Sequence, residues 1–170
     1  MSKAFTRDEN EGPDAEELAP LASPLPPGAT NYITRAGADR LRDELAHLVE
    51  TERPKLAGAA KGTESKQRLS ILNNRIFQLE ESLSSAQVIS HDPGPAPRVT
   101  FGAMVTVRDE PGERSTYRII GVDETDIERG WVSWVSPIAR ALMNSKAGQT
   151  VRFKSPSGEQ RLEIVAIDYE

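Results

Sequence analysis

TRAGADRLRDELAHLVE, residues 34–50, and TESKQRLSILNNRIFQLEESLSS, residues 63–85, repeat apolar side chains at steps of three and four residues. The repeated positions are Ala38, Leu41, Leu45 and Leu48 in the first stretch, and Leu69, Leu72, Ile76, Leu79 and Leu83 in the second. This spacing places one apolar face of a helix against a partner helix, as in a coiled coil. We therefore predict two helices, the first capped by Thr34 and the second by Thr63.

A short segment, Gly-Ala-Ala-Lys-Gly-Thr at residues 58–63, separates the two predicted helices. A connection this short brings successive helices back side by side, so we expect an antiparallel helical hairpin. Pro54 lies late in the first helix and has no backbone N–H, so it is expected to kink that helix or end it early. The predicted hairpin tip carries Lys61, Thr63, Glu64 and Lys66.

Beyond residue 101 the apolar residues alternate with polar ones, which is the period of a β-strand. Strands are expected within residues 103–107, 115–122, 131–135, 150–153 and 160–168. Before the fourth strand, Ser136 is expected to cap a short helix with Pro137 at its first position. The second half is thus predicted to be a small antiparallel β domain with one helix, and the whole chain belongs to the α+β class.

The composition divides the chain into four expected regions. Residues 1–30 combine acidic side chains with prolines and show no period, so they are expected to be a disordered tail. Residues 31–90 form the helical hairpin, residues 91–100 a proline-rich linker, and residues 101–170 the α+β domain. Neither helical stripe needs a second chain once the hairpin closes, so a monomer is expected.

Charge and cysteine content exclude several classes of protein. The chain has no cysteine, which rules out disulfides and thiolate chemistry and favours a reducing cytoplasm. Its net charge is −5, and residues 1–30, with two basic and six acidic side chains, contribute −4 of it. The remainder is too nearly neutral for a general nucleic-acid binder, and no stretch is long enough to cross a membrane. A protein partner is therefore expected.

The sequence offers little for catalysis. His47 and His91 have no Ser, Cys or Asp partner in a recognisable arrangement, and Cys/His metal motifs and glycine-rich phosphate loops are absent. A loop with Asp123, Glu124, Asp126 and Glu128 could in principle hold Mg²⁺, but acidic loops more often carry solvated charges. We therefore predict that the chain is not an enzyme and has no catalytic residue, metal site or cofactor.

Several segments together resemble the GreA/GreB family of bacterial transcription elongation factors. They are Asn31-Tyr32-Ile33-Thr34-Arg35-Ala36-Gly37, Leu41-Arg42-Asp43-Glu44-Leu45, Glu52-Arg53-Pro54, Phe101-Gly102-Ala103, Tyr117-Arg118-Ile119-Ile120-Gly121 and Ser136-Pro137-Ile138-Ala139-Arg140-Ala141-Leu142. The likeness spans residues 31–170, and its C-terminal segments are the more specific, because helical hairpins are common in proteins.

The resemblance implies a coiled coil that enters the secondary channel of RNA polymerase and an FKBP-like domain that docks on the channel rim. Docking is then expected at Val135, Ser136, Pro137, Ile138 and Arg140. The family usually has a polar residue where Val135 stands. In the family, acidic side chains at the tip help to hold Mg²⁺ in the polymerase active centre and so promote cleavage of backtracked RNA.

The tip of this chain differs from that of the family. Lys55 to Ser65 replaces a longer stretch that holds an Asp and a Glu, with about a dozen residues lost and each arm shortened by about 9 Å. Glu64 is the one acid left there, and Lys61 and Lys66 lie beside it. Nearby positive charge opposes cation binding, and Mg²⁺ favours several oxygen ligands. The resemblance therefore implies a polymerase-binding regulator of elongation or initiation without strong stimulation of transcript cleavage.

Other functions remain open at this point. One is a true cleavage factor that uses Glu64, with Glu52 as a second acid. Another is a regulator of nucleoside diphosphate kinase, since a protein described in that way shares this pair of domains and has a short coiled coil. A third is a prolyl isomerase or peptide binder, for which the chain has few aromatic residues to line a pocket.

Overall fold

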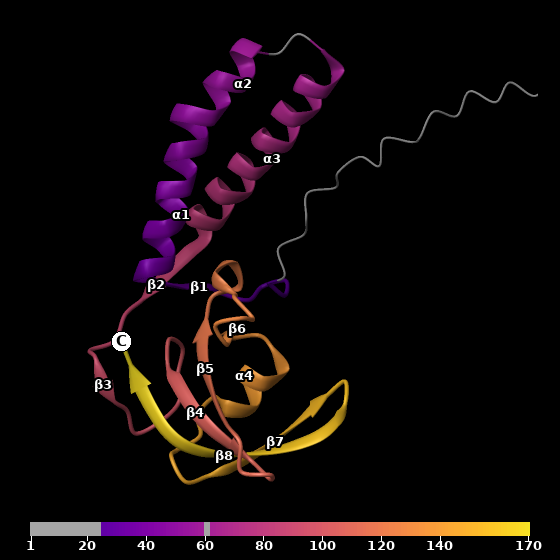
Figure 1. Ribbon diagram of the computed structural model, residues 1–170. Coiled ribbons are helices and arrows are strands. Elements are labelled where there is room, and N and C mark those ends of the chain that lie inside the picture. Colours follow the sequence, from indigo (N-terminus) through magenta and orange to yellow (C-terminus); the bar gives the residue numbers. More distant parts are fainter. Residues whose placement is uncertain (1–24, 60–61) are drawn as a thin grey trace, which may run out of the picture.

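The computed structural model describes residues 25–59 and 62–170, so most of the expected acidic tail lies outside the described residues. Its first half is helical and its second half is built on a β-sheet, which is the α+β class predicted from the sequence. Two helical arms lie side by side, run in opposite directions and project from the sheet (Figure 1). The first arm comprises α1 (Arg35–His47), a π-helical turn (Leu48–Glu52) and α2 (Arg53–Ala59), and the second arm is α3 (Thr63–Ser85).

The predicted apolar stripes pack against each other most tightly at the base of the arms. Ile33, Ala38, Leu41 and Leu79 are buried there, with Leu45, Leu48, Leu83 and Ala86 packed around them. Nearer the tip, Leu56 and Leu69 are only half-buried. Burial of apolar surface is the main favourable term in folding, so the base holds the arms together more strongly than the tip does.

The two helix starts differ from each other. The hydroxyl of Thr34 accepts a hydrogen bond from the amide of Gly37 at 3.0 Å, which confirms the predicted cap of α1. The predicted cap of α3 is wrong. Gly62 occupies the N-cap position without a side-chain hydrogen bond, and Thr63 is already helical, since glycine readily takes the non-helical backbone of an N-cap.

Pro54 does not end the first arm. The helix widens into the π-helical turn directly before it, and the amide of Arg53 donates to the carbonyl of Leu48. Proline cannot donate a backbone hydrogen bond and its ring crowds the preceding turn, so the wider turn absorbs the misfit and the helix continues to Ala59.

A short parallel pair of strands closes the base of the arms, and the sequence did not predict it. Strand β1 (Asn31–Thr34) precedes α1, and β2 (Ala86–Ile89) follows α3. The buried side chain of Asn31 donates from Nδ2 to the carbonyl of Ser82 and to Oγ of Ser85, both at 3.1 Å. The two ends of the helical hairpin are therefore fixed to each other.

The second half is a six-stranded sheet with the order β3-β8-β4-β5-β6, and β7 also pairs with β8. Its strands are β3 (Gly94–Pro95), β4 (Met104–Asp109), β5 (Arg114–Ile120), β6 (Trp131–Ser133), β7 (Thr150–Ser155) and β8 (Gly158–Tyr169). Four of the pairings are antiparallel, as expected, but β5 and β6 are parallel. A 3₁₀ turn (Val122–Glu124) and a loop connect β5 to β6 in place of a tight hairpin turn, so β6 runs in the same direction as β5.

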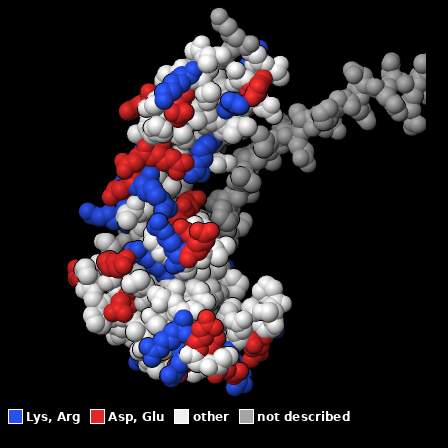
Figure 2. Space-filling model, in the orientation of Figure 1, with Lys and Arg blue, Asp and Glu red and all other residues white. Residues whose placement is uncertain are grey.

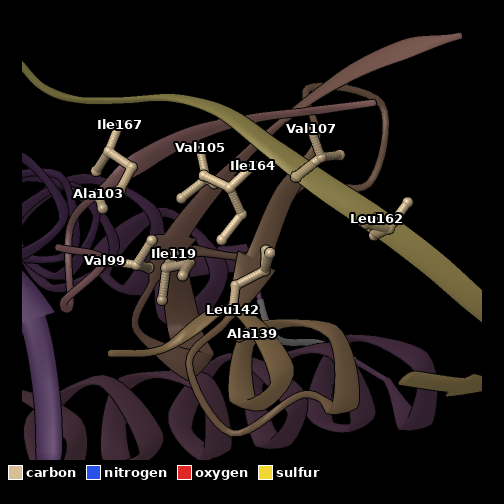
Figure 3. Close-up of a cluster of buried hydrophobic side chains, with 10 residues drawn as sticks. All are labelled: Val99, Ala103, Val105, Val107, Ile119, Ala139, Leu142, Leu162, Ile164 and Ile167. Atoms are coloured by element: carbon tan, nitrogen blue, oxygen red, sulfur yellow. The ribbon is translucent and has the colours of Figure 1, made fainter. Parts of the chain in front are cut away.

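One face of the sheet packs on α4 (Pro137–Leu142), and apolar side chains fill the space between them (Figure 3). The buried cluster is Val99, Ala103, Val105, Val107, Ile119, Ala139, Leu142, Leu162, Ile164 and Ile167. Val99 comes from residues 91–100, the segment expected to be a linker, which also contains β3. No helix in residues 25–59 or 62–170 is both long and apolar enough to span a bilayer.

Candidate functional site

The segment at the start of α4 presents some of its predicted docking residues and uses others to hold its position. The hydroxyl of Ser136 accepts from the amide of Ala139 at 3.3 Å, so it caps the helix as predicted. Ala139 is buried in the core, and the half-buried Ile138 packs against it. Pro137 and Arg140 are exposed. Their side chains are therefore free to meet another molecule while the neighbouring residues fix the helix.

The residues just before α4 are also held in place. Val135 is half-buried, and its amide donates to Oγ of Ser133 at 3.3 Å. Trp134 packs edge-on against Tyr32 of β1, with ring centroids 5.2 Å apart. The amide of Trp134 donates to the carbonyl of Ile120 at 2.9 Å. The approach to α4 is thus tied both to the sheet and to the base of the helical arms.

A compact loop beside this segment exposes one large apolar side chain. The loop is closed by two hydrogen bonds between Asp126 and Trp131, and Ile127 at its end is 91% exposed. The Trp131 ring lies near two guanidinium groups, those of Arg118 at 5.2 Å and Arg129 at 5.1 Å from the ring centroid. Such contacts stabilise an aromatic ring at a surface.

The hairpin tip carries acids that are already paired with cations. Glu64 Oε1 lies 2.7 Å from Nη2 of Arg68, one helical turn along α3. On the first arm, Glu52 Oε1 lies 3.2 Å from Nζ of Lys55 and 3.5 Å from Nε2 of His47. All the described tip residues named in the prediction, Thr63, Glu64 and Lys66, are exposed, and Lys61 lies outside the described residues. Each tip carboxylate thus faces a positive neighbour rather than a second carboxylate.

Glu124 joins the helical arms to the sheet, and sequence reasoning did not find this role. Its side chain is 4% exposed. Oε2 accepts from the amides of Thr34 at 2.9 Å and Gly121 at 3.0 Å, and Oε1 accepts from the hydroxyl of Thr34. Glu124 is therefore neither a solvated loop charge nor part of a Mg²⁺ site. It binds the first residues of α1 from the opposite side of the junction.

The neighbours of Glu124 show why it fits there. A Cβ atom at Gly121 would lie 2.5 Å from the carbonyl oxygen of Tyr32, and one at Gly37 would overlap the Glu124 carboxylate. Both glycines let the two halves approach closely. Asp123 continues the junction, because its carboxylate accepts from the hydroxyl of Ser82 in α3. These two glycines were the sequence signal for the junction, but a single sequence does not show which residue they approach.

One bidentate ion pair joins the two arms above the junction. Arg75 Nε and Nη2 lie 2.8 Å and 3.0 Å from the two carboxylate oxygens of Glu44. The hydrogen bond to Glu44 raises the pKa of Arg75, and the negative charges of Glu44 and Asp123 add to this effect against the opposing effect of partial burial. On the face drawn in Figure 2, Lys and Arg side chains alternate with Asp and Glu along the arms. The arms therefore do not present a face of one charge in that view.

The predicted docking residues lie in the sheet half near the base of the arms, and the predicted tip residues lie at the far end of the arms. The start of α4 lies beside the sheet, and the tip is the far end of the arms (Figure 1). Among residues 25–59 and 62–170, no three His, Cys, Asp or Glu side chains converge as a metal site would require. The arrangement resembles a base with a projecting arm, and the junction at Glu124 lies between the two.

Comparison with known proteins agrees with the sequence motifs. Residues 94–169 match the family described as "Transcription elongation factor, GreA/GreB, C-term". The chain is 41% identical over 154 residues to the transcription elongation factor GreA of Verminephrobacter eiseniae, covering 81% of this chain and 96% of that protein. It is 37% identical over 154 residues to the transcription elongation factor GreB of Pasteurella multocida, covering 83% of this chain and 98% of that protein.

A solved structure is also similar to the chain. The crystal structure of Thermus aquaticus Gfh1 is 25% identical and covers 82% of this chain and 99% of that one, with a TM-score of 0.39. The two sequence relatives are matched over nearly their whole length at 41% and 37% identity. The chain belongs to the GreA/GreB family.

Proposed function

We propose that this chain is an RNA polymerase-binding transcription factor that docks through its sheet half and directs its helical arms into the secondary channel of the polymerase. The observation that carries this proposal is the match to proteins named GreA and GreB over more than nine-tenths of their length, across both halves. In this proposal the arms act as the family's coiled coil, and the sheet half is its FKBP-like docking domain. The chain acts as a bound regulator and not as an enzyme in its own right.

The docking surface in this proposal is the start of α4. Pro137 and Arg140 are exposed there, while Ser136 and Ile138 are used to fix the helix. The backbone of this segment is already fixed and loses little freedom on binding, and arginine is one of the residues enriched in binding hot spots. Val135 adds an apolar side chain at the edge of the same surface.

The chemistry of the tip supports a role other than delivering Mg²⁺. A Mg²⁺ ion needs oxygen ligands in near-octahedral geometry, and proteins usually contribute one or two carboxylates to this set. Here the charged neighbour of Glu64 is Arg68 and that of Glu52 is Lys55, so positive charge, and not a second carboxylate, lies beside each acid. We therefore propose that the tip occupies the channel without strongly stimulating transcript cleavage.

The length of the arms supports the same proposal. The alignment with the Verminephrobacter GreA spans 154 residues, but 81% of this 170-residue chain is only about 138 residues. The difference is about 16 positions at which the relative has a residue and this chain has none. If these fall in the hairpin, each arm is shorter by about 8 residues, or about 12 Å at 1.5 Å per residue.

The test of this function is binding of the full-length chain to purified bacterial core RNA polymerase, measured by biolayer interferometry. Wild-type chain is expected to bind, and Arg140→Glu to weaken binding at least tenfold, because it reverses an exposed charge on the docking surface. Arg114→Glu is the matched control, since Arg114 is also an exposed arginine of the sheet half but lies at the start of β5. Absence of wild-type binding, or equal losses in the two variants, would contradict the proposal.

A further inference from the structure

The 3₁₀ turn Val122–Glu124 lies between the docking segment and the helical arms and contacts both arms. Glu124 holds the start of α1 through the amide and hydroxyl of Thr34. Asp123 accepts from Ser82 near the end of α3, and its carbonyl lies 3.4 Å from Nη2 of Arg40 in α1. Since one short turn is bonded to both arms, its position determines where the arms begin.

The same turn is connected to the docking segment by a path with few free torsions. The path runs from Glu124 through the loop closed by Asp126 and Trp131, and then along β6 to Ser136. Strand β6 is paired with β5, and Trp134 is bonded to the sheet and packed on Tyr32. A rotation of the arms relative to the docking segment would therefore have to break contacts at this turn.

We propose that Glu124 is a positioning residue that fixes the direction of the helical arms relative to the docking segment. The carboxylate suits this task because both of its oxygens accept, and its three donors come from the two sides of the junction. A neutral amide in its place keeps the shape but has one oxygen instead of two. With that oxygen in the place of Oε2, the amides of Thr34 and Gly121 keep their acceptor, and the hydroxyl of Thr34 loses the acceptor that it has in Oε1.

The length of the arms turns a small tilt at Glu124 into a large displacement of the tip. The first arm runs from residue 35 to residue 59, which is about 37 Å at 1.5 Å per helical residue. A tilt of about 10° at the base therefore displaces the tip by about 6 Å. That displacement is about half the diameter of a helix, which is about 10–12 Å, so loosening of the junction misdirects an arm that must enter a channel.

The structural part of this inference stands alone, and its functional part rests on the proposed polymerase binding. The chain has no cysteine, so two introduced cysteines provide the only labelling sites. Ser70 near the tip and Ser115 in β5 are exposed and suit this purpose. Spin labels are attached to these two cysteines in the full-length chain. Pulsed electron paramagnetic resonance then measures the distribution of distances between the arm and the sheet.

The distribution is compared in Glu124→Gln and in the matched control Glu128→Gln, an exposed glutamate in the next loop. Glu124→Gln is expected to broaden the distribution at least twofold, and Glu128→Gln to leave it unchanged. Circular dichroism checks that both variants retain their helices. A Glu124→Gln chain that is folded and has the mean and width of the wild type would overturn the proposal.

A second pair of variants guards against loss of folding in Glu124→Gln. Thr34→Ser keeps the hydroxyl that donates to Glu124 and caps α1, and Thr34→Val removes both the donor and the cap with little change in volume. The serine variant is expected to keep the narrow distribution of the wild type, and the valine variant to broaden it. Equal distributions in the two variants would contradict a positioning role.

The functional readout separates positioning from docking. Glu124→Gln is expected to bind core polymerase with the wild-type dissociation constant, because the docking segment is unchanged. It is expected to lose the ability to suppress the RNA cleavage that a GreA relative stimulates. A loss of affinity equal to the loss of effect would contradict the inference. If the wild-type chain does not bind polymerase, the proposed function fails, and the distance measurement still decides the role of Glu124.

Discussion

A Cβ atom at Gly37 would lie 2.0 Å from Oε1 of Glu124, so α1 approaches this carboxylate more closely than any side-chain-bearing residue permits. The contact is buried and joins residues 87 positions apart in the chain. It combines two unusual features, a glycine in the first turn of a helix and a buried glutamate without an ion-pair partner among the described contacts. The glycine leaves the space that the buried carboxylate occupies, and the carboxylate requires that this position have no side chain.

Gly37→Ala is therefore expected to lower the free energy of unfolding by about 2 to 4 kcal/mol, because the added methyl group displaces Glu124 from its donors. Urea denaturation followed by circular dichroism measures the change. Gly58→Ala is the control, since Gly58 is also helical but nothing lies within 4 Å of its Cβ position. That control is expected to raise stability by up to about 1 kcal/mol. Similar effects in the two variants would show that the contact does not matter.

The pair of Arg75 and Glu44 is expected to contribute little to stability despite its good geometry. The side chains are 46% and 37% exposed, so water and salt screen their charges. A double-mutant cycle with Arg75→Gln and Glu44→Gln is expected to give a coupling free energy of about 0.5 kcal/mol that declines in 1 M salt. A coupling several times larger, or one insensitive to salt, would contradict this account of the arms.

The direction of the Arg75 pKa shift gives the pH dependence of this pair. Because its pKa is raised in the folded state, Arg75 binds its proton more tightly there than in the unfolded chain. Its contribution is complete at neutral pH and is lost only as the pH rises through strongly alkaline values. The coupling free energy between Arg75 and Glu44 is therefore expected to stay constant across neutral pH, because Arg75 keeps its proton there. A loss of coupling through deprotonation of Arg75 in that range would contradict the raised pKa.

Stability is expected to fall along the arms from base to tip. Ala38, Leu41 and Leu79 are buried at the base, whereas Leu56 and Leu69 near the tip are only half-buried. Amide hydrogen exchange followed by mass spectrometry is expected to show slow exchange around Leu41 and Leu79 and fast exchange around Leu56 and Leu69. Uniform protection along both arms would contradict this gradient, and would indicate contacts at the tip beyond those described.

Local features of the fold were predictable from the sequence because their causes are local. The steps of three and four residues located both arms, and the Ser136-Pro137 pair located the start of α4 with its cap. Alternation of apolar residues located the strands of the sheet. In each case the residues that determine the element lie within it or next to it.

Features that depend on distant residues could not be read in this way. Strands β1 and β2 have four residues each and pair across the whole helical hairpin, so neither carries a periodic signal of its own. Glu124 lies in an acidic stretch that looks like a solvated loop, and its partner Thr34 is 90 positions away. The start of α3, by contrast, was misplaced by one residue for a local reason, because Gly62 takes the N-cap position next to Thr63.

We expect the chain to bind polymerase without supplying a pair of tip carboxylates. The direct test is a stalled, backtracked elongation complex with labelled RNA, incubated with Mg²⁺ and the full-length chain. The account predicts that release of short 3′ RNA fragments stays at the rate of polymerase alone, and that added chain suppresses the faster release caused by a GreA relative. Rapid Mg²⁺-dependent release of these fragments with the chain alone would contradict it.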